Sequence, residues 1–173
     1  MELSTQVDPS DIESIHIQSY SGAVSSASSE PEKWDPKTRE TADHSIPFLV
    51  AVGLQDGNVT PASFTAQRIA DPGLRTLLAN MKIEENPSFT EKYPSQYNCR
   101  IDVTTKSGKT LTVETSYPKG HGNNPLNDAE ISAKFRNLAS PTITNVQCDQ
   151  ALEVLWDLEN LPSLDGVFDS LVV

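Results

Sequence analysis

The sequence has few of the residues from which most metal sites and disulfide scaffolds are built. It contains 2 cysteines and 3 histidines in 173 residues. Cys99 and Cys148 lie far apart, which argues against a disulfide framework and makes a reducing compartment, such as the cytoplasm, the expected location. No two histidines have the local spacing of a metal motif, and no cysteine lies near one. We therefore expect no metal site.

Positive charge is also scarce. The chain has 13 lysines and arginines against 24 acidic residues, a net charge of −11. Such a chain repels phosphate groups, which argues against binding to nucleic acid or to an anionic membrane. The longest apolar run, residues 48–54, is too short to span a bilayer, and residues 1–11 do not resemble a signal peptide. An anionic substrate would need locally gathered cations, for which Lys37, Arg39 and Lys119 are the candidates.

Alternating apolar residues predict a small antiparallel sheet. Within residues 11–20, Ile15 and Ile17 alternate with polar residues, which is the pattern of a half-buried strand. His16 lies between them, so we expect it on the solvated face. Residues 98–105 and 110–116 alternate in the same way, and Ser107-Gly108 between them predicts a hairpin. A further short strand is expected at residues 82–85.

Capping residues and prolines predict the helices. Residues 45–55 form the clearest one, because Asp43 or Ser45 can cap it, Pro47 fits its first turn and Gly57 ends it. Further helices are expected at residues 62–67, 73–81, 127–139, 146–161 and 164–171. Residues 21–37 are expected to form a flexible loop. The predicted fold class is α+β, a small antiparallel sheet with packed helices followed by C-terminal helices.

The first candidate site is the polar segment at residues 34–48, which leads directly into the apolar helix. Loops often carry function, and a helix N-terminus attracts anions. One interpretation is that Arg39, His44 and Ser45 form an anion pocket at the start of this helix. The Asp43-His44 pair does not decide the matter, because the side chains of neighbouring residues need not meet. The alternative is that His44 only caps the helix or packs against its start.

The second candidate site is the loop at residues 117–125. Two glycines flank His121, and Lys119 lies two residues earlier. Such a loop allows backbone N–H groups to approach a ligand closely. The alternative is a mobile connection in which Lys119 and His121 are only solvated.

Several motifs, in order along almost the whole chain, make the sequence resemble the MmgE/PrpD family, which includes 2-methylcitrate dehydratase, cis-aconitate decarboxylase and iminodisuccinate epimerase. The matching residues are Trp34-Asp35-Pro36-Lys37-Thr38-Arg39-Glu40-Thr41-Ala42-Asp43-His44-Ser45-Ile46-Pro47, Leu54-Gln55-Asp56-Gly57, Val59-Thr60, Val103-Thr104-Thr105-Lys106-Ser107-Gly108, Tyr117-Pro118-Lys119-Gly120-His121, Asn124-Pro125 and Ala133-Lys134-Phe135-Arg136.

The resemblance implies only the C-terminal part of that family. Members are similar in having a large helical domain, then an α+β lid domain, then helices that return to the helical domain. Residues 1–142 would be the lid domain, and residues 143–173 the returning helices. The family's Lys-Pro-Tyr-Pro…His segment, just before the lid, has no counterpart here. Phe48 stands where several relatives carry a tyrosine. If the tyrosine hydroxyl takes part in proton transfer or carboxylate binding, Phe48 cannot replace it.

The implied activity is that of a cofactor-independent lyase or isomerase acting on a small di- or tricarboxylate. It abstracts a proton next to a carboxylate and then loses water or CO₂, or re-protonates the carbon. Arg39, His44, Ser45, Lys119 and His121 would supply one wall of the cleft, so this portion is expected to be inactive alone. The resemblance also favours a homodimer or association through exposed C-terminal helices, and a mitochondrial location if the full-length protein is eukaryotic. The alternative is a non-enzymatic module, or a subunit that completes a site with a separate helical protein.

Overall fold

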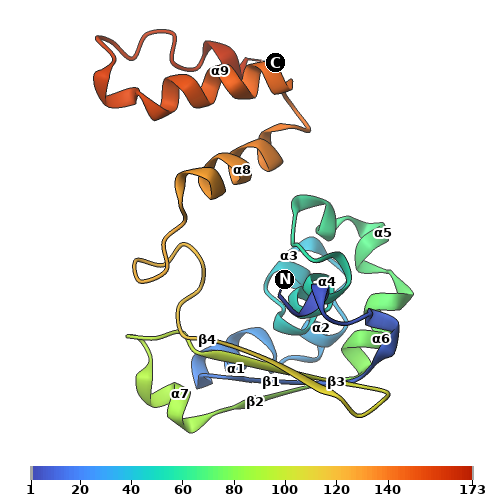
Figure 1. Cartoon of the computed structure of the whole chain (residues 1–173). Helices are drawn as coiled ribbons and strands as arrows, with labels where there is room; N and C mark the ends of the chain where they lie inside the picture. The colour runs from blue at the N-terminus through green and yellow to red at the C-terminus, as the bar shows by residue number, and fades with distance from the viewer. Residues whose placement is uncertain (1, 173) are drawn as a thin grey trace. The chain divides into compact units, whose positions relative to one another are not determined.

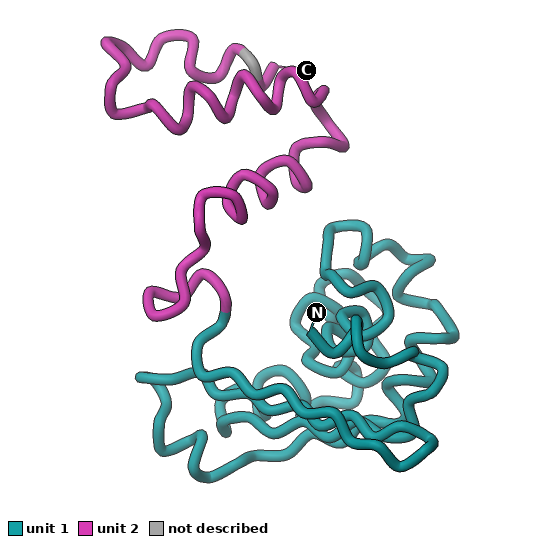
Figure 2. The backbone as a smooth tube through the Cα atoms, viewed as in Figure 1, with its two compact units in different colours: residues 1–118 teal, residues 119–173 magenta. Residues whose placement is uncertain are grey.

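A computed structural model describes residues 2–172, apart from the side chain of Ser170. The chain divides into two compact units, residues 1–118 and residues 119–173, which Figure 2 colours separately. Each unit is described by itself. Among the described helices, none combines the length and the apolar character that a membrane crossing requires.

The first unit is built on a four-stranded sheet with the order β2-β1-β3-β4 (Figure 1). β1 (Ile12–Ser19) pairs antiparallel with β3 (Cys99–Thr105), and β3 pairs antiparallel with β4 (Thr110–Thr115). β2 (Met81–Glu85) instead runs parallel to β1. The α+β prediction and the hairpin are confirmed, but the sheet is mixed. A parallel pair needs a long crossover, and the helices between β1 and β2 provide it.

Short helices fill that crossover and flank it. They are η1 (Leu3–Thr5), η2 (Pro9–Asp11), α1 (Ser21–Ala27), α2 (Pro31–Trp34), α3 (Arg39–Asp43), α4 (Ile46–Asp56), η3 (Pro61–Phe64), α5 (Ala66–Ile69), α6 (Pro72–Ala79) and α7 (Pro87–Lys92). The predictions of α4 and α6 are confirmed. The prediction of a loop over residues 21–37 was wrong where α1 and α2 form, and α7 was not anticipated. Each of these three helices is at most seven residues long, too short for an apolar period to be visible.

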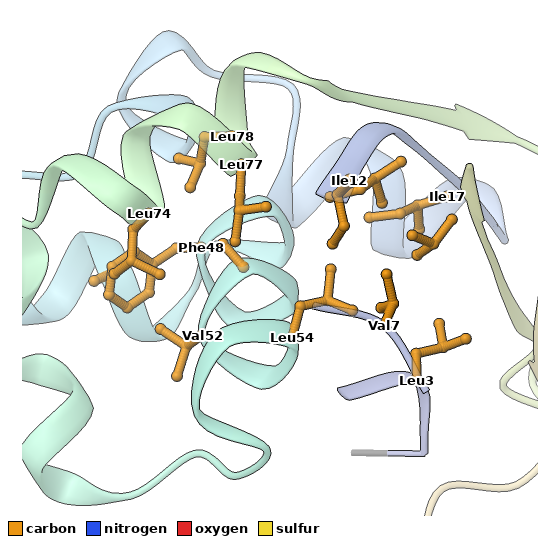
Figure 3. Close-up of a cluster of buried hydrophobic side chains, with 14 of the residues drawn as sticks. Leu3, Val7, Ile12, Ile17, Phe48, Val52, Leu54, Leu74, Leu77 and Leu78 are labelled. Atoms are coloured by element: carbon orange, nitrogen blue, oxygen red, sulfur yellow. The ribbon is translucent and has the colours of Figure 1, made fainter. Parts of the chain in front are cut away.

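The core of the first unit lies between the sheet and α4 and α6 (Figure 3). Ile15, Ile17 and Val103 point from the sheet into this core and are fully buried. Other buried members come from the helices: Phe48, Ala51, Val52 and Leu54 of α4, and Leu74, Leu77 and Leu78 of α6. α4 is apolar nearly all round, which explains why it is the most deeply buried helix of this unit.

The other face of the sheet is polar. His16 on β1 lies there, with its Nε2 atom 2.9 Å from Oε1 of Glu84 on β2. Arg100 and Asp102 form an ion pair on β3, at 3.0 Å, and the Thr112 hydroxyl donates to Asp102. The expectation that His16 lies on the polar face is therefore confirmed.

The second unit contains α8 (Asp128–Ala139), α9 (Asn145–Trp156), η4 (Leu158–Asn160) and η5 (Asp169–Leu171). Capping boxes begin both α-helices, at Asn127 with Glu130 and at Thr144 with Gln147. The predicted helix at residues 146–161 ends earlier, at Trp156, and continues only as η4. The predicted helix at residues 164–171 is reduced to the short turn η5.

Candidate functional site

The segment at residues 34–48 consists of the end of α2, a turn, α3 and the start of α4. Backbone carbonyls before and within it accept bonds from distant side chains. The indole Nε1 of Trp34 donates to the Ser28 carbonyl at 2.7 Å, and the Ser45 hydroxyl donates to the Lys33 carbonyl. These contacts hold the turns that join α2, α3 and α4.

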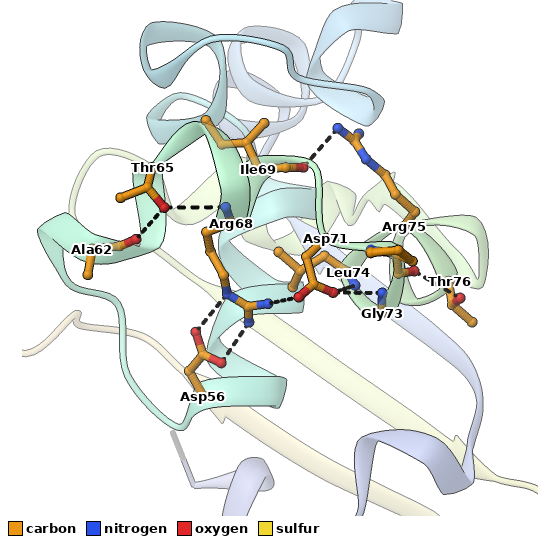
Figure 4. Close-up of polar contacts among 11 residues, drawn as sticks. Asp56, Ala62, Thr65, Arg68, Ile69, Asp71, Gly73, Leu74, Arg75 and Thr76 are labelled. Carbon is orange, nitrogen blue, oxygen red and sulfur yellow. Dashed lines mark hydrogen bonds and ion pairs between the residues drawn. The ribbon is translucent and has the colours of Figure 1, made fainter.

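Arg75 of α6 provides a further anchor. Its Nη2 atom donates to the carbonyls of Pro36 and Ile69, at 2.8 and 2.9 Å, and the bond to Ile69 is drawn in Figure 4. Its Nη1 atom lies 2.5 Å from Oδ1 of Asp35. Hydrogen bonding to Lys37, together with the charge of Arg75, holds the pKa of Asp35 below its usual value. Arg75 therefore fixes the turn that leads into α3.

Arg68 forms a second ionic cluster beside this segment (Figure 4). Its guanidinium contacts Oδ1 of Asp56, at 2.6 Å, and Oδ2 of Asp71, at 2.8 Å. Asp71 also caps α6 by accepting bonds from the backbone N–H groups of Gly73 and Leu74. Sequence reasoning missed both arginines, because Asp56 lies 12 residues before Arg68 and Pro36 lies 39 residues before Arg75, and such separations leave no local signal.

Ser45 is fully buried and acts as the N-cap of α4. Its hydroxyl accepts the backbone N–H of Phe48 at 3.1 Å while donating to the Lys33 carbonyl. Both hydrogen-bonding roles of the hydroxyl are thus used within the protein. Ser45 joins α2 to α4 and fixes the position of its neighbour, His44. The Phe48 ring, 1% exposed, packs in the core with its centroid 6.1 Å from that of Phe64.

His44 lies at the C-terminal end of α3 with an exposed ring. Its Nδ1 atom is 3.1 Å from the Glu40 carbonyl oxygen and 2.5 Å from Oδ1 of Asp43. The bond to the Glu40 carbonyl and the bond to the Asp43 carboxylate raise the pKa of His44 above its ordinary value. The sequence left open whether His44 joins an anion pocket, caps α4 or packs against its start; capping is wrong, because Ser45 is the N-cap of α4.

Arg39 is the first residue of α3 and is exposed. It therefore lies on the same five-residue helix that His44 ends. Together they place two exposed basic side chains on one short element of the first unit. Each of them could bind a carboxylate, and they share this element with two acidic side chains, Glu40 and Asp43.

Lys119 and His121 belong to the second unit. Lys119 pairs with Glu130 at the start of α8, with 2.9 Å between Nζ and Oε2. The hydrogen bond from the Asn127 backbone N–H and, to a smaller extent, the bond from Lys119 lower the pKa of Glu130. The loop is a tight turn, because the Gly120 N–H donates to the Asn124 carbonyl oxygen at 2.8 Å and Gly120 has a φ of 94°. The His121 Nδ1 atom accepts the Asn123 backbone N–H at 3.1 Å.

An open apolar depression of about 230 Å³ also lies in the first unit. Its lining is Glu2, Leu3, Leu49, Val50, Gly53, Leu54, Val59, Ile101 and Val113. None of the predicted site residues borders this depression. Its lining residues include no lysine, arginine or histidine that could bind a carboxylate. Over residues 2–172, no cluster of three or more histidine, cysteine or acidic side chains has the arrangement of a metal site.

Residues 1–158 match the model of the MmgE/PrpD C-terminal domain. The chain is 31% identical over 126 residues to mouse cis-aconitate decarboxylase, covering 73% of this chain and 26% of that protein. The human enzyme of the same name is 30% identical over the same shares. A mitochondrial 2-methylcitrate dehydratase from Yarrowia lipolytica is 32% identical over 84 residues, 46% of this chain and 16% of that protein.

The chain thus spans about a quarter of the length of the cis-aconitate decarboxylases it matches. The matched family model accounts for most of the chain, including the sheet, α3, α4 and both predicted site segments. The expected resemblance is therefore confirmed: this chain belongs to the MmgE/PrpD family, and residues 1–158 correspond to its C-terminal domain.

Proposed function

We propose that this chain is the C-terminal portion of a cofactor-independent lyase or isomerase acting on a small di- or tricarboxylate. The observation that carries the proposal is the match of residues 1–158 to the family's C-terminal domain, combined with relatives named as a decarboxylase and dehydratases. The reaction would resemble that of cis-aconitate decarboxylase or of 2-methylcitrate dehydratase.

The chain's own residues would bind the substrate's carboxylates rather than complete the chemistry. Arg39 and His44 are exposed and basic, and the buried Ser45 anchors the backbone next to His44. Lys119 and His121 are the corresponding candidates of the second unit. Removing a proton beside a carboxylate needs a base within hydrogen-bond reach and cations for the developing charge. We place the remaining groups in a helical domain outside this sequence, and we expect the chain alone to be inactive.

A turnover assay tests this proposal directly. The purified chain, alone and mixed with the helical domain of a family member, is incubated with cis-aconitate and with 2-methylcitrate. We expect no turnover by the chain alone and product formation only in a mixture. Turnover by the chain alone would show that a complete site is present, and a mixture inactive on every carboxylate tried would contradict the proposal.

The second candidate is a non-enzymatic module, or a subunit that completes a site with a separate helical protein. The observation favouring an obligate partner is the number of large apolar side chains exposed on the second unit. They are Ile131, Leu138, Val146, Trp156, Leu158, Leu164, Phe168 and Val172. Exposed apolar residues in this density are typical of an interface. A helical domain or a second copy in a homodimer would cover them.

We also propose a cytoplasmic location for the protein, or a mitochondrial one if it comes from a eukaryote.

A further inference from the structure

We infer that Asp43 is a positioning residue for His44: it holds the Nδ1–H of the imidazole, so that the opposite nitrogen, Nε2, is presented to a carboxylate of the ligand. The inference rests on the proposed function and specifies how one residue of that site would act. The sequence left open whether these neighbouring side chains meet. In the structure they do, at 2.5 Å between Nδ1 and Oδ1.

The hydrogen-bond pattern determines which ring nitrogen carries the proton. Nδ1 faces two acceptors, the carboxylate of Asp43 and the carbonyl oxygen of Glu40 at 3.1 Å. Neither acceptor can donate when Asp43 is ionised, so Nδ1 must be the donor. In the neutral ring this assigns the proton to Nδ1, and Nε2 is left for a ligand. In the cation, Nε2 also carries a proton and becomes a donor to an anion.

The position of His44 leaves most of its side chain exposed. The side chain is 66% exposed, whereas Asp43, at 34%, is partly shielded. The next residue, Ser45, is buried, and its hydroxyl both donates and accepts a hydrogen bond, so the backbone at His44 is anchored although its ring is exposed. An exposed ring on an anchored backbone, held through one nitrogen, suits a group that must bind a ligand without losing its orientation.

The surrounding charges favour the cation. α2, α4, α5 and η3 pack against α3, and the charges that act on the ring are those of Asp43 and Glu40, both negative. The C-terminal end of α3 also presents backbone carbonyls to the ring, as its bond to Glu40 shows. The cationic ring thus persists to higher pH than in free histidine. Carboxylate binding should be strongest where His44 is protonated and should weaken as the pH rises through the His44 pKa.

Nuclear magnetic resonance of the ¹⁵N-labelled full chain tests the inference without any need for turnover. The histidine ring nitrogens are followed from pH 5 to pH 9, with His44→Gln assigning the signals. We expect the neutral form of His44 to carry its proton on Nδ1. In Asp43→Asn and Asp43→Ala, the His44 titration should move to lower pH and the preference for Nδ1 should weaken. Glu84→Gln is the matched control, since Glu84 contacts His16 and should leave the His44 titration unchanged.

A proton on Nε2 in the neutral wild type, or a His44 titration unaffected by both Asp43 variants, would overturn the positioning role. Fumarate then probes the binding role, because both of its carboxylates stay ionised over this range. We expect fumarate to shift the His44 signals, with affinity falling about threefold or more between pH 6 and pH 9. His44→Gln should abolish the pH dependence.

A fumarate affinity independent of pH would overturn the presentation of Nε2 to carboxylates. The turnover assay of the helical-domain mixture tests the proposed function separately. If the mixture turns over substrate but neutral His44 carries its proton on Nε2, the positioning role of Asp43 is wrong and the proposed function stands. The expected tautomer and fumarate response without any turnover would instead contradict the enzymatic proposal.

Discussion

The guanidinium of Arg75 on α6 donates a hydrogen bond to the backbone carbonyl of Pro36, 2.8 Å away and 39 residues earlier in the chain. The same Nη2 atom bonds the Ile69 carbonyl, and Nη1 contacts Asp35. One side chain thus connects the turn before α3, the end of α5 and the helix α6. Since α3 carries Arg39 and His44, Arg75 supports the candidate site without belonging to it.

Replacement of Arg75 by methionine should destabilise the first unit by about 2–4 kcal/mol, because two carbonyls and a carboxylate lose a charged donor. Arg75→Lys should recover only part of this, since an ammonium cannot reproduce the planar fork. Urea unfolding followed by Trp34 fluorescence, in a Trp156→Phe background, gives the free energy. Arg100→Met, on the polar face of the sheet, is the control and should change stability much less. Equal effects of the two methionine variants would argue against the anchoring role.

Replacement of Ser45 by alanine should cost about 1–3 kcal/mol, because α4 loses its N-cap and the Lys33 carbonyl loses its donor. The same fluorescence assay measures the change. Ser25→Ala is the matched control, as Ser25 is exposed on α1 and its hydroxyl bonds only the nearby Gly22 carbonyl. We also expect Ser45→Ala to broaden the His44 ring signals. A Ser45 variant as stable as the Ser25 variant would contradict the role given to this hydroxyl.

Replacement of Phe48 by tyrosine should destabilise the chain by about 1–3 kcal/mol, because the added hydroxyl would enter an apolar core. The ring is 1% exposed and lies beside Val52 and Leu74 (Figure 3), with the Phe64 ring centroid 6.1 Å from its own. Thermal or urea unfolding detects the loss. Phe168→Tyr is the control, because Phe168 is exposed and should tolerate the hydroxyl. Unchanged stability of Phe48→Tyr would mean that the hydroxyl reaches a polar partner, as a tyrosine with a functional role would.

Both thiols should be unreactive in the folded chain. Burial raises the pKa of Cys99 to about 11, and Cys148 is fully buried. The thiolate is the reactive form, so a disulfide reagent at pH 8 should react fully only after guanidinium unfolding. Because the folded pKa lies above the unfolded value of about 9, this thiol contributes a loss of stability as the pH rises above 9. Cys148→Ala isolates the Cys99 reaction, and rapid labelling of that folded variant would contradict the prediction.

The combined variant Leu164→Ser, Phe168→Ser should reduce self-association of the chain without lowering its stability. These side chains are 69% and 66% exposed, so removing them takes apolar area from the surface and nothing from the core. Sedimentation velocity over a range of protein concentrations measures the association. Leu152→Ser is the control, because Leu152 is buried and its loss should destabilise the second unit. Unchanged association of the combined variant would assign the interface to another surface.

The sequence predicted those elements whose signal is local. The α4 helix carries its own cap and stop in Ser45 and Gly57, and the β3–β4 hairpin carries its turn in Gly108. The sequence did not reveal that β2 runs parallel to β1. The direction of β2 depends on the path of the long connection between the two strands, which has no local sequence signal. α1 and α2 were missed because helices of seven and four residues cover fewer than two turns, too few for an apolar pattern to repeat.

The candidate site divides along the same line. Residue type and order identified His44 and Arg39 as candidates. The sequence also shows that Asp43 directly precedes His44. Whether Asp43 and His44 touch depends on the angle at which α3 ends, which sequence alone does not give. The anchoring by Arg75 depends on α6 packing beside residues far earlier in the chain, so it appears only in three dimensions.

The parallel pairing of β1 with β2 also bears on how this unit folds. Ser19 ends β1, and Met81, which begins β2, pairs with Ile15. Helices α1 to α6 lie within the loop that this pairing closes. Loop closure of that length must be achieved before the strand contacts stabilise it, and such non-local pairing slows folding. The β3–β4 hairpin, by contrast, closes over a few residues. We therefore expect this hairpin to form early and the β2 edge to join last, with the polar segment at residues 34–48 becoming ordered in the same late step.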